Sequence, residues 1–353
     1  MNTISSQNPF FETYSTLHST VPFDKIKTGD YVPAIREGIR RQNAEIEAII
    51  RNPEVPTFAN TVLAYEKSGE MLHRVSTVFG NLLSAETNDD MQELAKSIMP
   101  LLSEHGNNIT LNEKLFARIK AVYDQKDQAN LTPEQSKLLE KVYNSFVRSG
   151  ANLEGEAKEQ YRALSKELSL LTLQFGENNL KETNDYKLVL TDPAQLAGLP
   201  QSAIDAAAET AKEKGVEGWV FTLQAPSYSP FMTYASNRDL RCKLYMAYNT
   251  KCTHDNETNN LEIVKKLVNT RLAIAQLLGY SSFAEYNLQE RMAENSGNVY
   301  KLLDQLLDAY TPTAKQEYAE VEALARQLEG SDFTVMPWDW SYSVSYTHLT
   351  LPT

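Results

Sequence analysis

The sequence is poor in the residues that build most metal and disulfide sites, with two cysteines and five histidines among 353 residues. Cys242 and Cys252 lie within one predicted helical region, so they form neither a disulfide framework nor the paired cysteines of a zinc knuckle. We therefore expect two free thiols in a reducing compartment.

Long apolar runs are also missing, since none approaches the ~20 residues that a membrane-spanning helix needs. The N-terminus lacks the basic segment followed by an apolar run that is typical of a signal peptide. Acidic residues outnumber basic ones by 46 to 34, which gives a net charge of −12 and disfavours contact with a phosphate backbone. The sequence predicts a cytoplasmic protein that binds neither membranes nor nucleic acids.

Motifs that carry catalysis are absent as well. There is no Gly-x-Ser-x-Gly elbow and no glycine-rich phosphate loop. No histidine begins a His-Glu-x-x-His run, in which two histidines one helical turn apart bind zinc and the glutamate acts as base. We assign no catalytic, cofactor-binding or metal-binding residue in this chain. The histidines are His18, His73, His105, His254 and His348.

Three weaker candidates are better explained without chemistry. Glu104-His105 falls near a predicted helix end, where surface placement or a contact with the helix dipole is favoured over metal ligation. His254-Asp255 is expected in a solvated loop. Cys242 would need a histidine from elsewhere to act as a nucleophile, so a buried structural thiol is the favoured interpretation.

Apolar residues recur at helical spacing along most of the sequence. The apolar content of 42% and the charged content of 23% are ordinary for a globular protein. Two segments, 186–191 and 219–223, instead alternate or carry β-forming residues and predict a small two-stranded ribbon, with Pro226 and Pro230 after it. The predicted fold class is therefore mainly α. Loops are expected at 1–30 and 337–340, and helices at about 32–51, 58–85, 89–106, 115–122, from 133, 161–175, 202–214, 231–250, 258–278 and 299–328, the last bent or restarted at Pro312.

The best-defined stretch runs from Arg271 to Met292. Its first helix reaches Gly279, a residue suited to the left-handed position that closes a helix. Ser282 and Glu285 then match a capping box that starts a second helix. Taken alone, this pattern predicts a helix–helix corner and no chemistry.

Several segments together resemble the thimet oligopeptidase and peptidyl-dipeptidase family of zinc metallopeptidases. The resemblance is carried by TYASNRDLRCKLYMAYNTK (233–251), RLAIAQLLGYSSFAEYNLQERMA (271–293) and PWDWSY (337–342), in the family's order and spacing. The N-terminal NPFF…VPFDKIKTGDYVPAI (8–35) and LAGLPQSAIDAAAETAKEKG (196–215) resemble the peptidyl-dipeptidase or oligopeptidase A side of the family. The likeness covers nearly all of residues 8–342.

The resemblance implies a mostly helical, two-lobed fold with a deep channel that admits short peptides. In this family, zinc is held by the two histidines of His-Glu-x-x-His and by a glutamate on a following helix, while the motif glutamate activates the zinc-bound water. Those residues lie downstream of the Trp-Asp motif and have no counterpart here. The resemblance thus implies zinc in the parent protein and none bound by this chain.

The sequence leads to three regions and one main hypothesis. Residues 1–230 are the N-terminal helical region with the ribbon, and 231–342 are the start of the peptidase region. Residues 343–353 match nothing in the family, so we interpret them as a non-native tail that includes His348. We expect an inactive N-terminal fragment of a peptidase for short peptides, built to expose apolar stripes on helices such as 299–328. The alternative is a helical scaffold or interaction protein without enzymatic function.

Overall fold

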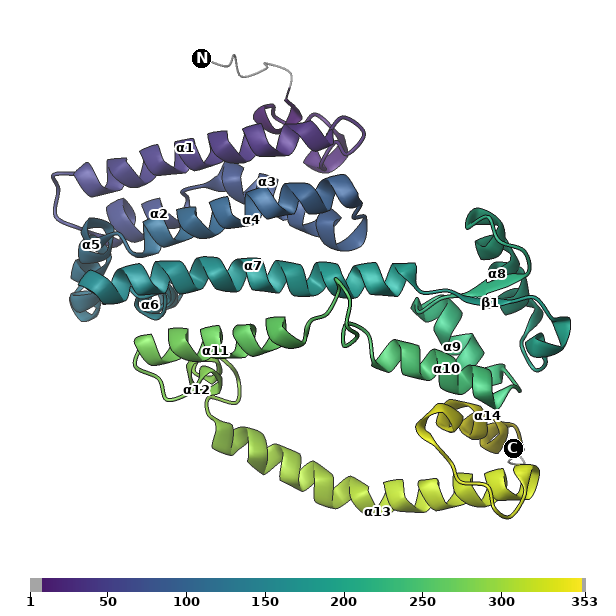
Figure 1. Cartoon of the computed structure of the whole chain (residues 1–353). Coiled ribbons are helices and arrows are strands. Elements are labelled where there is room, and N and C mark those ends of the chain that lie inside the picture. The colour runs from purple at the N-terminus through teal and green to yellow at the C-terminus, as the bar shows by residue number, and fades with distance from the viewer. Residues whose placement is uncertain (1–7, 351–353) are drawn as a thin grey trace. The chain divides into compact units, whose positions relative to one another are not determined.

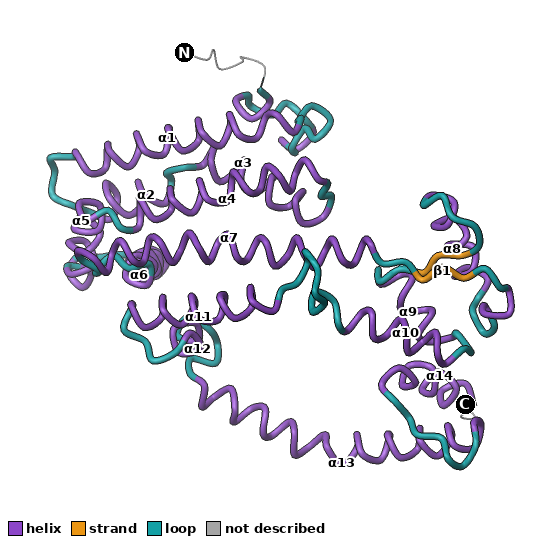
Figure 2. Tube along the Cα trace, viewed as in Figure 1, coloured by secondary structure: helices purple, strands orange, loops and turns teal. Residues whose placement is uncertain are grey.

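The computed structural model describes the backbone of residues 8–350 and the side chains of residues 8–345. It is mainly helical, with a two-stranded antiparallel ribbon in which Val189 of β1 (Leu188–Leu190) pairs with Val220 of β2 (Trp219–Phe221) (Figures 1 and 2). The predicted fold class and the ribbon are confirmed. No helix among the described residues has the length and apolarity needed to cross a membrane.

The chain divides into two compact units, which are described separately. The first comprises the residues up to Leu173 together with Leu267–Phe283, and the second comprises Gln174–Lys266 and the residues from Ala284 onward. The helices α7 (Gly155–Asp185) and α11 (Leu261–Leu277) each contribute to both units.

The first unit contains two large apolar cores and a smaller third one around Tyr161. In one, the rings of Phe10, Tyr31 and Phe79 pack in series, with centroids 5.4 and 5.3 Å apart. The other large core surrounds Leu115 and Phe146, which are both fully buried. The further helices of this unit are α1 (Tyr31–Arg51), α2 (Ala64–Glu66), α3 (Glu70–Ala85), α4 (Asp89–Thr110), α5 (Glu113–Asp124) and α6 (Pro133–Arg148).

The helix predicted over 58–85 is wrong as a single element. A π-helical turn, Phe58–Leu63, leads into the short α2, and the chain then breaks before α3 begins at Glu70. Gly69 makes the break because its φ of +74° is left-handed, a conformation that side-chain-bearing residues avoid. The apolar periodicity of the sequence continues through Gly69 and therefore does not indicate the break.

The corner after α11 forms as predicted. Gly279 has a φ of +88°, the Tyr280 N–H donates to the Ala275 carbonyl at 2.9 Å, and the Gly279 N–H donates to Gln276 at 3.0 Å. This pair of hydrogen bonds is the Schellman arrangement that closes helices. The short α12 (Phe283–Leu288) follows. The capping box at Ser282 remains a prediction.

The second unit packs its ribbon against helices. Its core gathers Leu188, Leu190, Phe221, Phe231 and Leu244, and the rings of Phe221 and Phe231 meet edge to face with centroids 4.6 Å apart. The helices of this unit are α8 (Gln201–Glu213), α9 (Ala225–Tyr234), α10 (Arg238–Asn249), α13 (Ser296–Glu329) and α14 (Trp340–Thr350).

Two boundaries in this unit differ from the prediction. The helix expected over 231–250 is two helices, because Ala235 is extended and the Asn237 side chain caps α10 by accepting from the Leu240 N–H. Pro226 lies in the first turn of α9, where a missing N–H costs nothing, rather than outside a helix.

The C-terminal part is more helical than predicted. Pro312 lies inside an unbroken α13, which ends at Gly330 with a φ of +117°. Residues 337–340 are not a loop: a 3₁₀ turn, Pro337–Asp339, leads directly into α14. The interpretation of 343–353 as non-native stays a prediction; 351–353 and the side chain of His348 lie outside the described residues.

Candidate functional site

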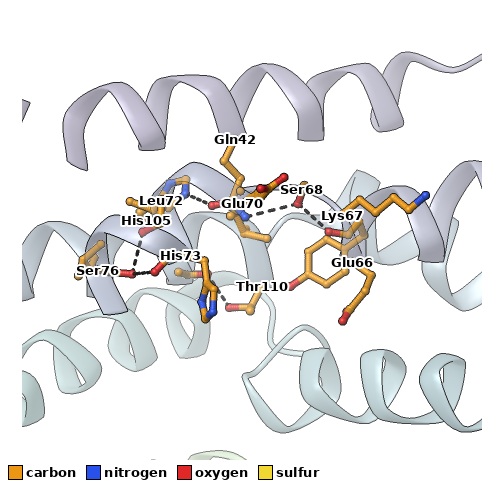
Figure 3. A pocket seen from close by; sticks show the side chains of 15 residues that line it. Gln42, Glu66, Lys67, Ser68, Glu70, Leu72, His73, Ser76, His105 and Thr110 are labelled. Atoms are coloured by element: carbon orange, nitrogen blue, oxygen red, sulfur yellow. Dashed lines mark hydrogen bonds between the residues drawn. The ribbon is translucent and has the colours of Figure 1, made fainter. Parts of the chain in front are cut away.

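One groove in the first unit has a volume of about 860 Å³ and lies between α1, the break at Gly69, α3 and α4 (Figure 3). It exists because the left-handed Gly69 separates α2 from α3 and opens the surface above α4. Its polar lining side chains include Gln42, Ser68, Glu70, His73, Ser76, His105 and Thr110.

A chain of hydrogen bonds fixes the buried wall of this groove. His105 Nε2 lies 2.7 Å from Gln42 Oε1, and Gln42 Nε2 donates to Ser68 Oγ at 3.4 Å. Since a carbonyl oxygen only accepts, this arrangement assigns the proton to Nε2 of His105. The break itself is held by Glu45, whose Oε2 accepts from the Gly69 N–H at 2.7 Å.

His105 is 6% exposed, so the predicted surface placement is wrong. Burial lowers the pKa of the imidazole below its ordinary value, because the charged form loses its solvent. His105 therefore faces the groove as a neutral ring, held in one orientation by Gln42.

The hydroxyl groups of the groove are not activated for attack on a substrate. Ser76 donates to the Leu72 carbonyl at 2.8 Å, and Ser68 donates to the Tyr65 carbonyl at 2.7 Å. Thr110 donates to the Gly106 carbonyl at 3.0 Å. A nucleophile needs its proton taken by a base, and here backbone carbonyls hold these protons instead. These three hydroxyl groups are therefore not activated nucleophiles.

A second polar cluster, in the other unit, is centred on Glu182 near the end of α7. One carboxylate oxygen accepts from the Cys252 N–H and from the Thr258 hydroxyl, each at 2.8 Å. His254 lies on the outside of the cluster, with Nε2 3.7 Å from the other oxygen. Its side chain is 54% exposed, which confirms the predicted loop position.

These residues do not fit a zinc ion. Burial, reinforced by the charge of Glu182, raises the pKa of the Cys252 thiol to about 11, whereas zinc binds the thiolate. Glu182 is already occupied by its two hydrogen-bond donors. Within residues 8–345, no group of three or more histidine, cysteine and acidic side chains could hold a metal ion. Cys242, expected to be buried, is half-buried.

The second unit also contains a buried carboxylate that sequence reasoning missed. Asp339 is fully buried and accepts hydrogen bonds from Arg238, from Arg241 and from the Met336 N–H. Burial alone would raise the pKa of Asp339, but the bonds from Arg238, Met336 and Arg241 outweigh it, and the pKa is lowered. These bonds fix the Pro337–Asp339 turn to the start of α10.

The signal for this cluster was present in the resemblance. Arg238 and Arg241 lie in the quoted segment 233–251, and Asp339 lies in PWDWSY. The structure brings the two segments together, so their charged residues make one structural unit. Arg241 and Asp339 are both almost fully buried, so this pair has a packing role, whereas the side chain of Arg238 is partly exposed.

Both of these segments lie in a region that resembles a known protein family. Residues 231–350 match peptidase family M3. The chain is 35% identical to dipeptidyl carboxypeptidase of Escherichia coli over 341 residues, which is 96% of this chain and 50% of that protein. It is 30% identical to oligopeptidase A of Haemophilus influenzae, over 95% of this chain and 49% of that protein.

The resemblance drawn from the sequence is thereby confirmed. The matched region starts at Phe231 in α9 and contains both α10 and the Pro337–Asp339 turn, so it includes the whole Asp339 cluster. The chain spans about half the length of the curated relatives that it matches.

Proposed function

We propose that this chain is part of a zinc-dependent peptidase that hydrolyses short peptides, and that the zinc ligands lie outside these 353 residues. The observation that carries the proposal is the similarity over 96% of the chain to a protein named dipeptidyl carboxypeptidase. That name supports release of dipeptides from the C-terminal ends of peptide substrates. A cytoplasmic location remains part of the proposal.

The chemistry of the described side chains supports placing the zinc ligands elsewhere. The sequence contains no His-Glu-x-x-His run, and the one cluster that combines cysteine, histidine and glutamate keeps its thiol protonated. We assign this chain the role of supporting structure and peptide-facing surface, and no catalytic step.

The purified chain tests this assignment. It should bind no stoichiometric zinc and should leave a short quenched-fluorescent peptide intact, with Escherichia coli dipeptidyl carboxypeptidase as the positive control. Tight binding of one zinc ion together with cleavage of the peptide would show that the chain carries its own catalytic site.

The scaffold alternative makes a different prediction for the same sample. A self-sufficient scaffold should unfold cooperatively and bind no hydrophobic dye, because its apolar faces would be covered. A peptidase part with uncovered apolar faces should bind the dye. The exposed apolar side chains of α13 favour binding of the dye.

A further inference from the structure

The N-terminal half of α13 carries an apolar face that nothing else described in the second unit covers. Six large side chains on it, which we call the uncovered stripe, are between 37% and 65% exposed. They recur at intervals of three and four residues and so lie on one side of the helix. They are Tyr300, Leu302, Leu303, Leu306, Leu307 and Tyr310.

The same face is covered further along the helix. Val321 and Ala325 are 5% and 3% exposed. Val321 lies eighteen residues after Leu303, and Ala325 lies eighteen residues after Leu307. Because eighteen residues make five helical turns, all four side chains share one side of α13. The uncovered stripe therefore continues an interface that already exists in its C-terminal half.

The existing interface is made with α14. Tyr318 stacks on Trp340 with ring centroids 5.8 Å apart and planes 9° apart, and α14 lies beside the C-terminal part of α13 (Figure 1). A helix packed on α13 is thus the observed way of covering this face. The uncovered stripe offers the same kind of surface for one or more further helical segments.

We propose that the uncovered stripe is the docking surface for a segment of the same polypeptide that lies outside these 353 residues. The matched relatives are about twice as long as this chain, so they contain material to cover it. The proposal is independent of zinc chemistry, because it concerns packing alone.

Two other occupants fit the charges less well. A second copy would bring together two chains of net charge −12, which repel each other. An anionic membrane favours helices with lysine and arginine on the polar side, whereas the side opposite the stripe carries Asp304 and Asp308 beside Lys301. An apolar segment of the same protein meets neither difficulty.

Co-expression with a defined partner tests the proposal. The probe is the part of Escherichia coli dipeptidyl carboxypeptidase that lies outside its match to this chain, and capture is measured through a tag on this chain in the presence of a chelator. The probe should be recovered in a one-to-one ratio. The double variant Leu303→Glu, Leu307→Glu should reduce recovery at least tenfold.

The control places the same change in charge on the opposite side of the helix. Lys301 and Gln305 are exposed, and Lys301→Gln with Gln305→Glu should leave recovery unchanged. Absence of capture, or equal loss with both double variants, overturns the proposal. The proposal is also overturned if this chain alone forms a dimer in sedimentation velocity and only the Leu303→Glu, Leu307→Glu variant dissociates that dimer. Since capture is measured without zinc or hydrolysis, it can succeed where the proposed peptidase function fails.

Discussion

Arg241 and Asp339 form a buried ion pair, with Nη2 of the arginine 2.9 Å from Oδ1 of the aspartate and both side chains almost free of solvent. Arg241 also donates to the Ala235 carbonyl at 2.7 Å and lies over the Tyr342 ring. The pair joins residues 98 positions apart and so links the start of α10 to the Pro337–Asp339 turn within the second unit.

Breaking this pair should destabilise the second unit strongly. Asp339→Asn leaves Arg241 buried without its counter-charge, and removal of one partner of such a pair costs about 3 kcal/mol or more. The free energy of unfolding, measured by chemical denaturation, reports the loss. Asp332→Asn, in the exposed loop seven residues earlier, should change it by no more than about 0.5 kcal/mol. Equal effects of the two substitutions would contradict the structural role of Asp339.

Substitution by alanine should change stability in opposite directions at two glycines of the first unit, Gly69 and Gly80. In Gly69→Ala, the new Cβ would strain a φ of +74° and clash with the Gln42 amide, displacing the side chain that holds His105. We expect a loss of about 2 kcal/mol, from left-handed strain and one hydrogen bond. Gly80→Ala meets nothing within 4 Å inside α3 and should gain up to about 1 kcal/mol. Thermal unfolding should show a lower melting temperature for Gly69→Ala and a higher one for Gly80→Ala.

Stability should fall in mild acid because of His105. Its folded-state pKa lies below the ordinary 6.5, so as pH falls the unfolded chain takes up a proton first. The free energy of unfolding therefore decreases below about pH 6.5, by at most about 1.4 kcal/mol per pH unit for one proton. His105→Gln should flatten this decrease between pH 7 and 5.

A slope that His105→Gln leaves unchanged would show that the imidazole is not held neutral by burial.

The two thiols should differ sharply in reactivity toward a disulfide reagent. Cys252 is 4% exposed and the pKa of its thiol is about 11, so at pH 8 roughly one in a thousand is ionised. The half-buried Cys242 should react first. In a Cys242→Ser background, Glu182→Gln should speed the labelling of Cys252, since the carboxylate helps to raise that pKa. Equal rates for the two thiols in the native chain would contradict the burial of Cys252.

Local signals predicted the fold well where they were stereochemically specific. Gly279 closed its helix as expected, and the helix expected from residue 133 starts at Pro133, where Thr132 and Gln135 form a capping box. Apolar periodicity located the helices but not their breaks: it passed unchanged through Gly69 and through Ala235. The break at Gly69 is held by Glu45, 24 residues away, and the one at Ala235 is followed by the Asn237 cap, and periodicity reports neither.

The sequence alone also did not predict the polar clusters, because their partners lie far apart in the chain. His105 meets Gln42 across 63 residues, and Asp339 meets Arg238 across 101. Neither pair has a spacing that a local motif could reveal. The family resemblance located the segments that carry the Asp339 cluster, and only the fold showed that their charges meet.

Hydrolysis by the reassembled protein is the most direct test of the central claim. This chain is co-expressed with the unmatched part of Escherichia coli dipeptidyl carboxypeptidase, and the captured complex is assayed with a quenched-fluorescent peptide. Our account predicts cleavage that is abolished by a chelator and restored by zinc, with none from this chain alone. A one-to-one complex that carries zinc and leaves the peptide intact would contradict it.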